Sequence, residues 1–305
     1  MLVVVLAVAV LYLAGMRRVR RSGRPWPRAW AVAFLIGGTG AVVIATMSFL
    51  GVYQHVLFYV RAVQTVLLLL AAPLFLALGR PLSLFKAALP GPGRRAEALV
   101  HSRAARILTF PAITAMVLVI VPFLLYFTPW YEAGLRNATV RELTYAALLL
   151  PGLVFFWTLL RVDPVPKAYP YLVALWVTGA EVVGDAVLGL AVIADQHLIA
   201  GSYYQALGRP WGPSLRADQV IGGGALWILG DLVGLPFLAA QLIQMIREDD
   251  QEAARVDAEL DAGAQKAAAP GAGEADMTPA ATSDSQPWWE SDSRFTGRFH
   301  RPGSE

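Results

Sequence analysis

The chain has 305 residues, of which 56% are hydrophobic and 15% are charged. Soluble domains carry about 25% charged residues, so this composition excludes an ordinary soluble protein and indicates a membrane protein. The chain has no cysteine and only four histidines, which excludes disulfides, thiolate metal sites and cysteine nucleophiles. Residues 1–246 hold 19 basic and 9 acidic side chains, whereas the remaining residues hold 6 and 13. The two parts are therefore interpreted separately.

Seven apolar segments approach or exceed the roughly 20 residues that a membrane-spanning helix needs. They are Leu2–Met16, Trp30–Val52, His55–Leu78, Ile107–Phe127, Val140–Leu160, Tyr169–Ala194 and Val220–Ile246. The first is the shortest, but its arginines follow the apolar run, whereas a secretory signal carries its charge before it. We predict an all-α integral membrane protein with seven transmembrane helices, the first of which is an uncleaved anchor.

Basic residues gather in alternate loops. Residues 17–29, 80–106 and 161–168 carry six, six and two Lys or Arg, whereas the other loops together carry four. Positively charged loops stay in the cytoplasm. The amino terminus is therefore predicted to be outside the cell and the carboxyl terminus to be cytoplasmic.

The composition also divides the chain along its length. Residues 1–246 are predicted to form the membrane domain, and the acidic segment 247–264 is predicted to extend the last helix into the cytoplasm. Residues 265–305 are rich in Ala, Gly, Pro and Ser and are predicted to be a disordered cytoplasmic tail. No internal repeat of the kind found in many transporters is evident.

Four charged residues lie well inside the predicted spans, away from their ends, where charges are expensive and often functional. They are Arg61, Glu181, Asp185 and Asp231. At 1.5 Å per residue, Arg61, Asp185 and Asp231 lie about 9, 14 and 16 Å from the outer ends of their predicted helices. We predict an intramembrane polar cluster in which Arg61 pairs with Asp185 or Asp231. A proton or ion path, and a site for a ligand or partner, remain open alternatives.

Other patterns indicate no enzyme. No arrangement of Ser, His and acidic residues has the spacing of a hydrolase, so no catalytic residue is predicted. The glycines at 222–224 lack the Lys-Ser/Thr of a phosphate loop, and close helix packing is the favoured interpretation. No nucleic-acid partner is indicated.

Several strings resemble the CtaG-like cytochrome c oxidase assembly factor family, especially its actinobacterial members. The strings are Gly51–Phe58, Ala72–Pro81, Phe155–Trp157, Val162–Pro166, Arg209–Trp211 and Asp218–Trp227. The most specific is the last, which carries Asp218, Gln219, Gly222, Gly223 and Trp227. The resemblance spans roughly residues 8–262.

The resemblance implies a seven-span protein of the bacterial cell (inner) membrane that assists the maturation of a haem-copper oxidase, including its copper centre. It implies oxidase subunits as partners and the lipid bilayer as surroundings. The family's His-x-x-x-His pair falls on Arg61 and Thr65, so two expected copper ligands are replaced. The acid of the family's Gly-Glu-x-Pro string falls on Asp231.

A copper site in this chain is possible only with fewer ligands than the family resemblance implies. Imidazole and thioether groups are suitable copper ligands, and His55 and Met47 are the candidates in the outer half. We expect a metal-free, divergent member of the family that binds and stabilises a partner. The alternatives are a membrane transporter and a structural accessory subunit of a respiratory complex.

Overall fold

A computed structural model describes residues 2–89, 91–93, 98, 101–164 and 169–268. Within these residues the regular structure is helical, and they contain no strand. The elements are α1 (Leu2–Arg21), α2 (Arg28–Val32), η1 (Ala33–Thr39), α3 (Gly40–Met47), α4 (Phe49–Tyr53), α5 (Phe58–Val66), η2 (Leu67–Ala71), α6 (Ala72–Leu78), α7 (Pro81–Ala88), α9 (Arg103–Leu108), α10 (Pro111–Phe127), α11 (Trp130–Arg136), α12 (Ala138–Leu160), α13 (Tyr171–Ala194), α14 (Gly201–Ala206) and α15 (Leu215–Ala268).

The helical segments confirm the predicted fold class. Six segments among the described residues are long and apolar enough to cross a membrane: Leu2–Arg21, Arg28–Tyr53, Phe58–Ala88, Ala138–Leu160, Tyr171–Ala194 and Leu215–Ala262. Helices α10 and α11 meet at a bend of 68° and make a seventh span when they are counted together. The orientation of the termini stays a prediction.

Three predicted spans begin three or more residues away from their predicted starts. The third begins at Phe58 instead of His55, because Leu57 is extended. The fourth begins at Pro111, since Ile107 belongs to the separate helix α9 and proline favours the first helical turn. The last begins at Leu215, five residues earlier than predicted. These shifts change the depths of Arg61 and Asp231, whereas the depth of Asp185, measured from Ala194, is unchanged.

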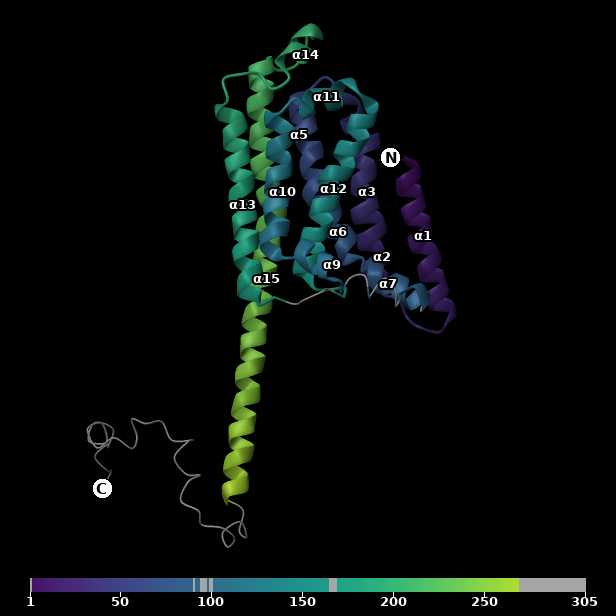
Figure 1. The fold of residues 1–305 in the computed structure, drawn as a ribbon, viewed down its shortest axis with the longest axis vertical. Helices are drawn as coiled ribbons and strands as arrows, with labels where there is room; N and C mark the ends of the chain where they lie inside the picture. The colour runs from purple at the N-terminus through teal and green to yellow at the C-terminus, as the bar shows by residue number, and fades with distance from the viewer. Residues whose placement is uncertain (1, 90, 94–97, 99–100, 165–168, 269–305) are drawn as a thin grey trace, which may run out of the picture. The chain divides into compact units, whose positions relative to one another are not determined.

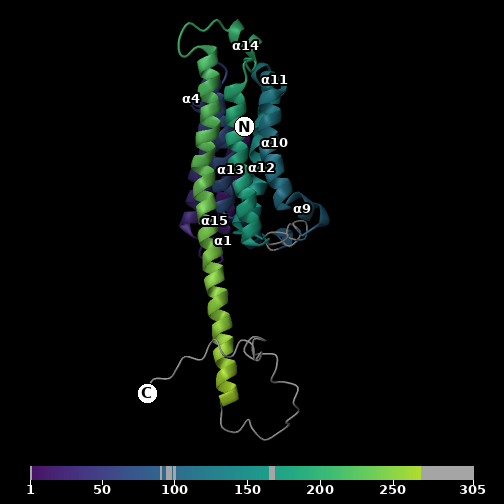
Figure 2. The same cartoon turned by 90° about the vertical axis from the view of Figure 1, so that its left-hand side faces the viewer.

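The helices approach closely where small residues separate them. A methyl group on Gly37 of η1 would lie 2.5 Å from the Phe75 ring of α6, and one on Gly152 of α12 would lie 1.9 Å from the Leu69 carbonyl oxygen of η2. Helix α10 packs against both α12 and α13, as Figure 2 shows. Such small-residue contacts let backbones pack tightly in lipid, where no hydrophobic force drives the helices together.

The bundle has two distinct ends (Figure 1). Helices α11 and α14 lie at one, called here the α11 end, and α7 and α9 lie at the other, called the α7 end. The chain forms two compact units, Met1–Ile246 and Arg247–Glu305, and the boundary lies within α15. Residues 247–264 are helical as part of α15. The predicted disordered tail falls, from residue 269 onward, outside the described residues.

Candidate functional site

Arg61 is the centre of a buried polar cluster near the α11 end. Its side chain is only 1% exposed, and it projects from α5 one turn after that helix begins. Its Nη1 donates hydrogen bonds to Gln54 Oε1 at 2.5 Å and to Gln64 Oε1 at 2.9 Å. The Tyr145 hydroxyl donates to the same Gln54 oxygen at 3.0 Å. The cluster therefore joins α5, the α4–α5 turn and α12.

The Arg61 charge is held by neutral groups. Among the described residues no carboxylate forms an ion pair with Arg61, and its Nε and Nη2 atoms have no hydrogen-bond partner. The guanidinium lies 5.6 Å from the centre of the Tyr145 ring, within the range of a cation–π interaction. A methyl group on Gly134 of α11 would lie 3.5 Å from Nη2. The free side of the guanidinium therefore faces α11.

The three acids form a second cluster, between α13 and α15. Glu181 is 2% exposed and Asp185 is 7% exposed, and the two residues lie one helical turn apart on α13. A methyl group on Gly230 of α15 would lie 2.3 Å from Asp185 Oδ2, so that glycine admits the carboxyl group. Asp231 is half-buried. Glu181 Oε1 and Asp231 Oδ1 are buried without a hydrogen-bond partner.

The predicted pairing of Arg61 with Asp185 or Asp231 is wrong. Counted from the observed starts of α5 and α15, Arg61 lies about 4.5 Å into its helix and Asp231 about 24 Å into its own. Gly222, seven residues into α15, lies level with Phe58 at the start of α5, because a methyl group on it would lie 2.4 Å from the Phe58 ring. From that level Asp231 lies about 9 Å farther along the bundle than Arg61. Asp185 lies on α13, which packs on α10. The single predicted cluster is therefore two clusters of opposite charge.

Asp218 and Gln219 hold the α11 end together. Asp218 accepts hydrogen bonds from the backbone N–H groups of Phe58 at 3.1 Å and Tyr59 at 2.9 Å, and so caps α5 from another helix. It also pairs with Arg209 at 3.3 Å, and both side chains are at most 4% exposed. Gln219 accepts from the Ile199 N–H at 2.9 Å and donates to carbonyls of the last turn of α13 and of the α13–α14 connection.

The other residues of this string pack helices. A methyl group on Gly223 would lie 2.8 Å from the Gly189 carbonyl oxygen of α13. Conversely, one on Gly189 would lie 2.7 Å from Trp227 Cβ. Gly222, Gly223 and Trp227 thus belong to the close approach of α15 to α13 and α5.

The two candidate copper ligands lie in different surroundings. His55 is half-buried between α4 and α5, and burial, together with the positive charges of Arg141 and Arg61, lowers the pKa of its imidazole. Met47 ends α3 and is 37% exposed. Within the described residues, no group of three or more His, Cys, Asp or Glu side chains has the arrangement of a metal site.

Sequence comparison identifies the family. A model of the cytochrome c oxidase caa3 assembly factors (Caa3_CtaG) matches residues 10–248. The chain belongs to this family. It is 31% identical to an uncharacterized protein of Mycobacterium leprae over 264 residues, which are 84% of this chain and 40% of that protein.

Two further relatives match a similar share of the chain at a similar identity. Uncharacterized proteins of Mycobacterium bovis and Mycobacterium tuberculosis are each 32% identical over 263 residues, which are 83% of this chain and 40% of theirs. The chain therefore spans about 40% of the length of the curated relatives it matches. No solved structure matches the chain.

The Arg61 cluster does not suit copper in this Caa3_CtaG chain. The family's histidine pair falls on Arg61, a permanent cation without an acceptor atom, and on Thr65. The Thr65 hydroxyl bonds to the Arg61 carbonyl oxygen and to the Tyr126 hydroxyl, each at 3.0 Å. Copper prefers imidazole and sulfur ligands, whereas the groups around Arg61 are amides and hydroxyls. No copper chemistry is therefore assigned to this cluster.

Sequence reasoning missed three residues that organise the Caa3_CtaG fold. Gln54 lies in the turn between α4 and α5, outside the apolar runs. Arg209 and Asp163 lie outside the apolar runs. Asp163 accepts hydrogen bonds from the N–H groups of Leu82 at 3.0 Å and Ser83 at 2.9 Å, and so caps α7 as Asp218 caps α5.

Proposed function

We propose that this chain assists the assembly of a haem-copper oxidase by binding one of its subunits within the membrane, and that it does so without ligating copper at Arg61. Membership of the Caa3_CtaG family supports the assembly role, because the match covers residues 10–248. The observation that carries the metal-free part is the bonding of Arg61 to Gln54 and Gln64. On this proposal the chain is not an enzyme.

Electrostatics supports the absence of copper. A guanidinium keeps its positive charge in proteins, and a copper ion beside it would face like-charge repulsion in a low-dielectric site. A copper site would therefore need donors that outweigh this repulsion. The amide oxygens of Gln54 and Gln64 already accept hydrogen bonds from Arg61 Nη1.

We further propose that the protein lies in the bacterial cell membrane with the α7 end in the cytoplasm. The last turn of α1, which carries Arg18, Arg20 and Arg21, lies at the α7 end together with α9, which carries Arg103 and Arg106 (Figure 1). Positive residues favour the cytoplasmic side. The amino terminus of α1 then faces outward.

Complementation tests the assembly role. In a strain that lacks the chromosomal copy, the wild-type chain should restore oxidase activity and the haem spectrum of the membranes. The double variant Arg61→His, Thr65→His restores the family's histidine pair and should give no gain in oxidase copper content. Wild-type expression that leaves oxidase activity unrestored would contradict the assembly role.

Metal analysis tests the copper part separately. Detergent-purified wild-type protein and the His55→Ala variant should both hold far less than one copper per chain after incubation with Cu(I) and removal of the excess. If the wild type bound one copper ion per chain and His55→Ala did not, the metal-free proposal would be overturned. The assembly role would be unaffected by that result.

The acid cluster favours one alternative function. Glu181 Oε1 and Asp231 Oδ1 lack hydrogen-bond partners although they are buried, and carboxyl groups inside a membrane often mark ion paths. Proton or cation flux into proteoliposomes that Glu181→Gln abolishes would favour a transporter. Stoichiometric co-purification with mature oxidase would instead favour an accessory subunit over an assembly factor.

A further inference from the structure

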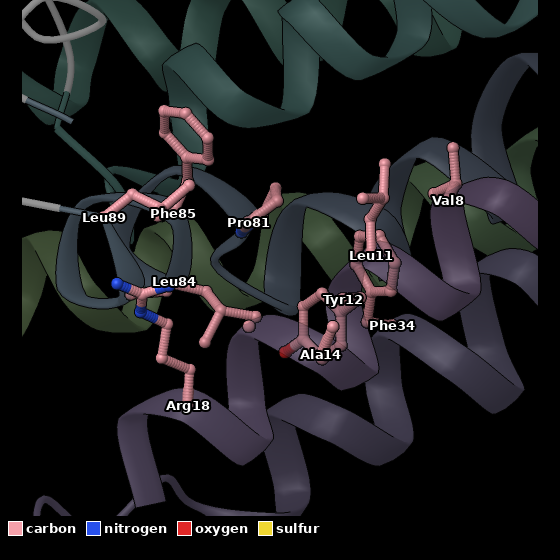
Figure 3. A pocket seen from close by; sticks show the side chains of 12 residues that line it. Val8, Leu11, Tyr12, Ala14, Arg18, Phe34, Pro81, Leu84, Phe85 and Leu89 are labelled. Atoms are coloured by element: carbon pink, nitrogen blue, oxygen red, sulfur yellow. The ribbon is translucent and has the colours of Figure 1, made fainter. Parts of the chain in front are cut away.

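A groove opens between α1 and α7 at the α7 end (Figure 3). Its volume is about 480 Å³, within the range of about 300–1,000 Å³ that small-molecule sites occupy. Val8 and Leu11 of α1, Phe34 of η1, and Leu84 and Phe85 of α7 line it with carbon. An apolar wedge of this size between membrane helices has to be filled by lipid or by another apolar group.

The floor of the groove is fixed by contacts of its own. The Tyr12 ring stacks on Phe34, with ring centres 4.0 Å apart. The Tyr12 hydroxyl donates to the Gly79 carbonyl oxygen at 2.7 Å and accepts from Trp26 Nε1 at 3.2 Å. Because this hydroxyl is already bonded on both sides, the floor presents hydrocarbon to any occupant.

One end of the groove is positively charged. Arg18 is the only charged residue among those that line it, and its side chain reaches from α1 toward Leu84 of α7 (Figure 3). It forms no ion pair within the described part of the chain, and Arg17, Arg20 and Arg21 continue the positive charge along the same helix end. Guanidinium groups bind phosphate oxygens in a bidentate fashion.

The length of the groove matches an amphiphile. Ten residues of α1 separate Arg18 from Val8, which is about 15 Å at 1.5 Å per residue. An occupant with a phosphate at Arg18 would therefore extend an apolar chain of that length along Leu11 and Phe34 to Val8. Basic pockets between transmembrane helices bind anionic lipid headgroups in this manner.

We propose that the α1–α7 groove is a binding site for one anionic phospholipid, with its phosphate on Arg18 and an acyl chain along α1. The site is independent of the proposed assembly function. If Arg18 only extended its charge to the membrane interface, the groove would bind an anionic lipid no better than the rest of the surface does. The test therefore compares Arg18 with a neighbouring arginine that does not line the groove.

The test uses the full chain, purified in a neutral detergent. Its thermal unfolding midpoint is measured against increasing phosphatidylglycerol or phosphatidylcholine with identical acyl chains. Three variants are compared with the wild type: Arg18→Gln, the matched control Arg20→Gln, and Ala14→Phe, which fills the groove from an exposed position. Size-exclusion profiles check that each variant is folded.

Phosphatidylglycerol should stabilise the wild type at lower concentration than phosphatidylcholine. Arg18→Gln should weaken the phosphatidylglycerol response about fivefold, the usual contribution of one basic residue at an anionic lipid surface. Arg20→Gln should leave it unchanged, and Ala14→Phe should weaken the response to both lipids.

Three results would overturn the proposal. If both lipids raised the unfolding midpoint of the wild type equally, the site would not recognise the lipid headgroup. If Arg18→Gln and Arg20→Gln weakened the phosphatidylglycerol response equally, the response would come from the general positive charge of this surface and not from the groove. A dimer that Ala14→Phe disrupts would assign the groove to a second copy of the chain.

Discussion

The separation of Arg61 from the acid cluster can be measured with a double-mutant cycle. The changes are Arg61→Met, Asp185→Leu and the two together. Because the residues share no partner in the structure, their effects on the free energy of unfolding should add to within about 0.5 kcal/mol. An ion pair between them would instead make the double variant much more stable than the sum of the single losses implies.

The size of the Arg61→Met effect follows from what it leaves behind. Gln54 Oε1 keeps the Tyr145 hydroxyl as a donor at 3.0 Å, whereas Gln64 Oε1 loses the Arg61 Nη1 donor. One buried acceptor without a partner costs about 1–3 kcal/mol. Removal of a buried cation that lacks a counter-ion offsets part of this cost. The net loss should stay below about 3 kcal/mol, compared with about 3–5 kcal/mol when a buried carboxylate is left behind.

Unfolding of the detergent-purified variants by denaturant or heat gives these values. As a positive control, Arg61→Met combined with Gln64→Leu should be more stable than the sum of its single variants implies, because both partners of the hydrogen bond become apolar. A coupling of about 2 kcal/mol or more between positions 61 and 185, well above the range for independent sites, would refute the two-cluster structure.

Three further predictions concern other parts of the molecule. Reporter fusions should place Met1 outside the cell and Ala264 inside, and a cytoplasmic Met1 would contradict the orientation. Because the pKa of His55 is lowered in the folded protein, the unfolded chain binds more protons, and His55 lowers stability as the pH falls from about 6.5 through its folded pKa. Between pH 7.5 and 5.5 the melting temperature should therefore fall less for His55→Gln than for the wild type. Asp218→Ala leaves the buried Arg209 without its carboxylate and should cost about 3–5 kcal/mol, whereas an effect below 1 kcal/mol would show that the pair contributes little.

The sequence predicted the helices well because each membrane span is encoded locally. An apolar run of sufficient length forms a helix in lipid, where every backbone polar group has to bond within its own segment. The ends were less certain, since they depend on contacts between distant residues. Asp218, 160 positions away, caps the N–H of Phe58, and no local pattern near Phe58 indicates that the helix starts there.

The site was predicted less well for a related reason. Depth along a helix follows from counting residues, but the direction that a side chain faces depends on how the helices are packed. Counting placed Arg61 and Asp185 in the same outer half of the membrane, yet Arg61 bonds to Gln54 and Gln64 whereas Asp185 lies against Gly230 of α15. Gln54 is an uncharged residue in the turn between α4 and α5, so neither charge nor position within an apolar run indicates its role.

The two clusters differ in how their charge can be neutralised. A carboxyl group can take up a proton and so lose its charge. A guanidinium cannot lose its charge in a protein, so Arg61 depends on the oxygen atoms that its neighbours supply. Neutral replacement of an acid should therefore disturb the bundle less than removal of Gln54 or Gln64, the acceptors of Arg61. The amides that surround Arg61 are thus as necessary to this divergent site as Arg61 itself.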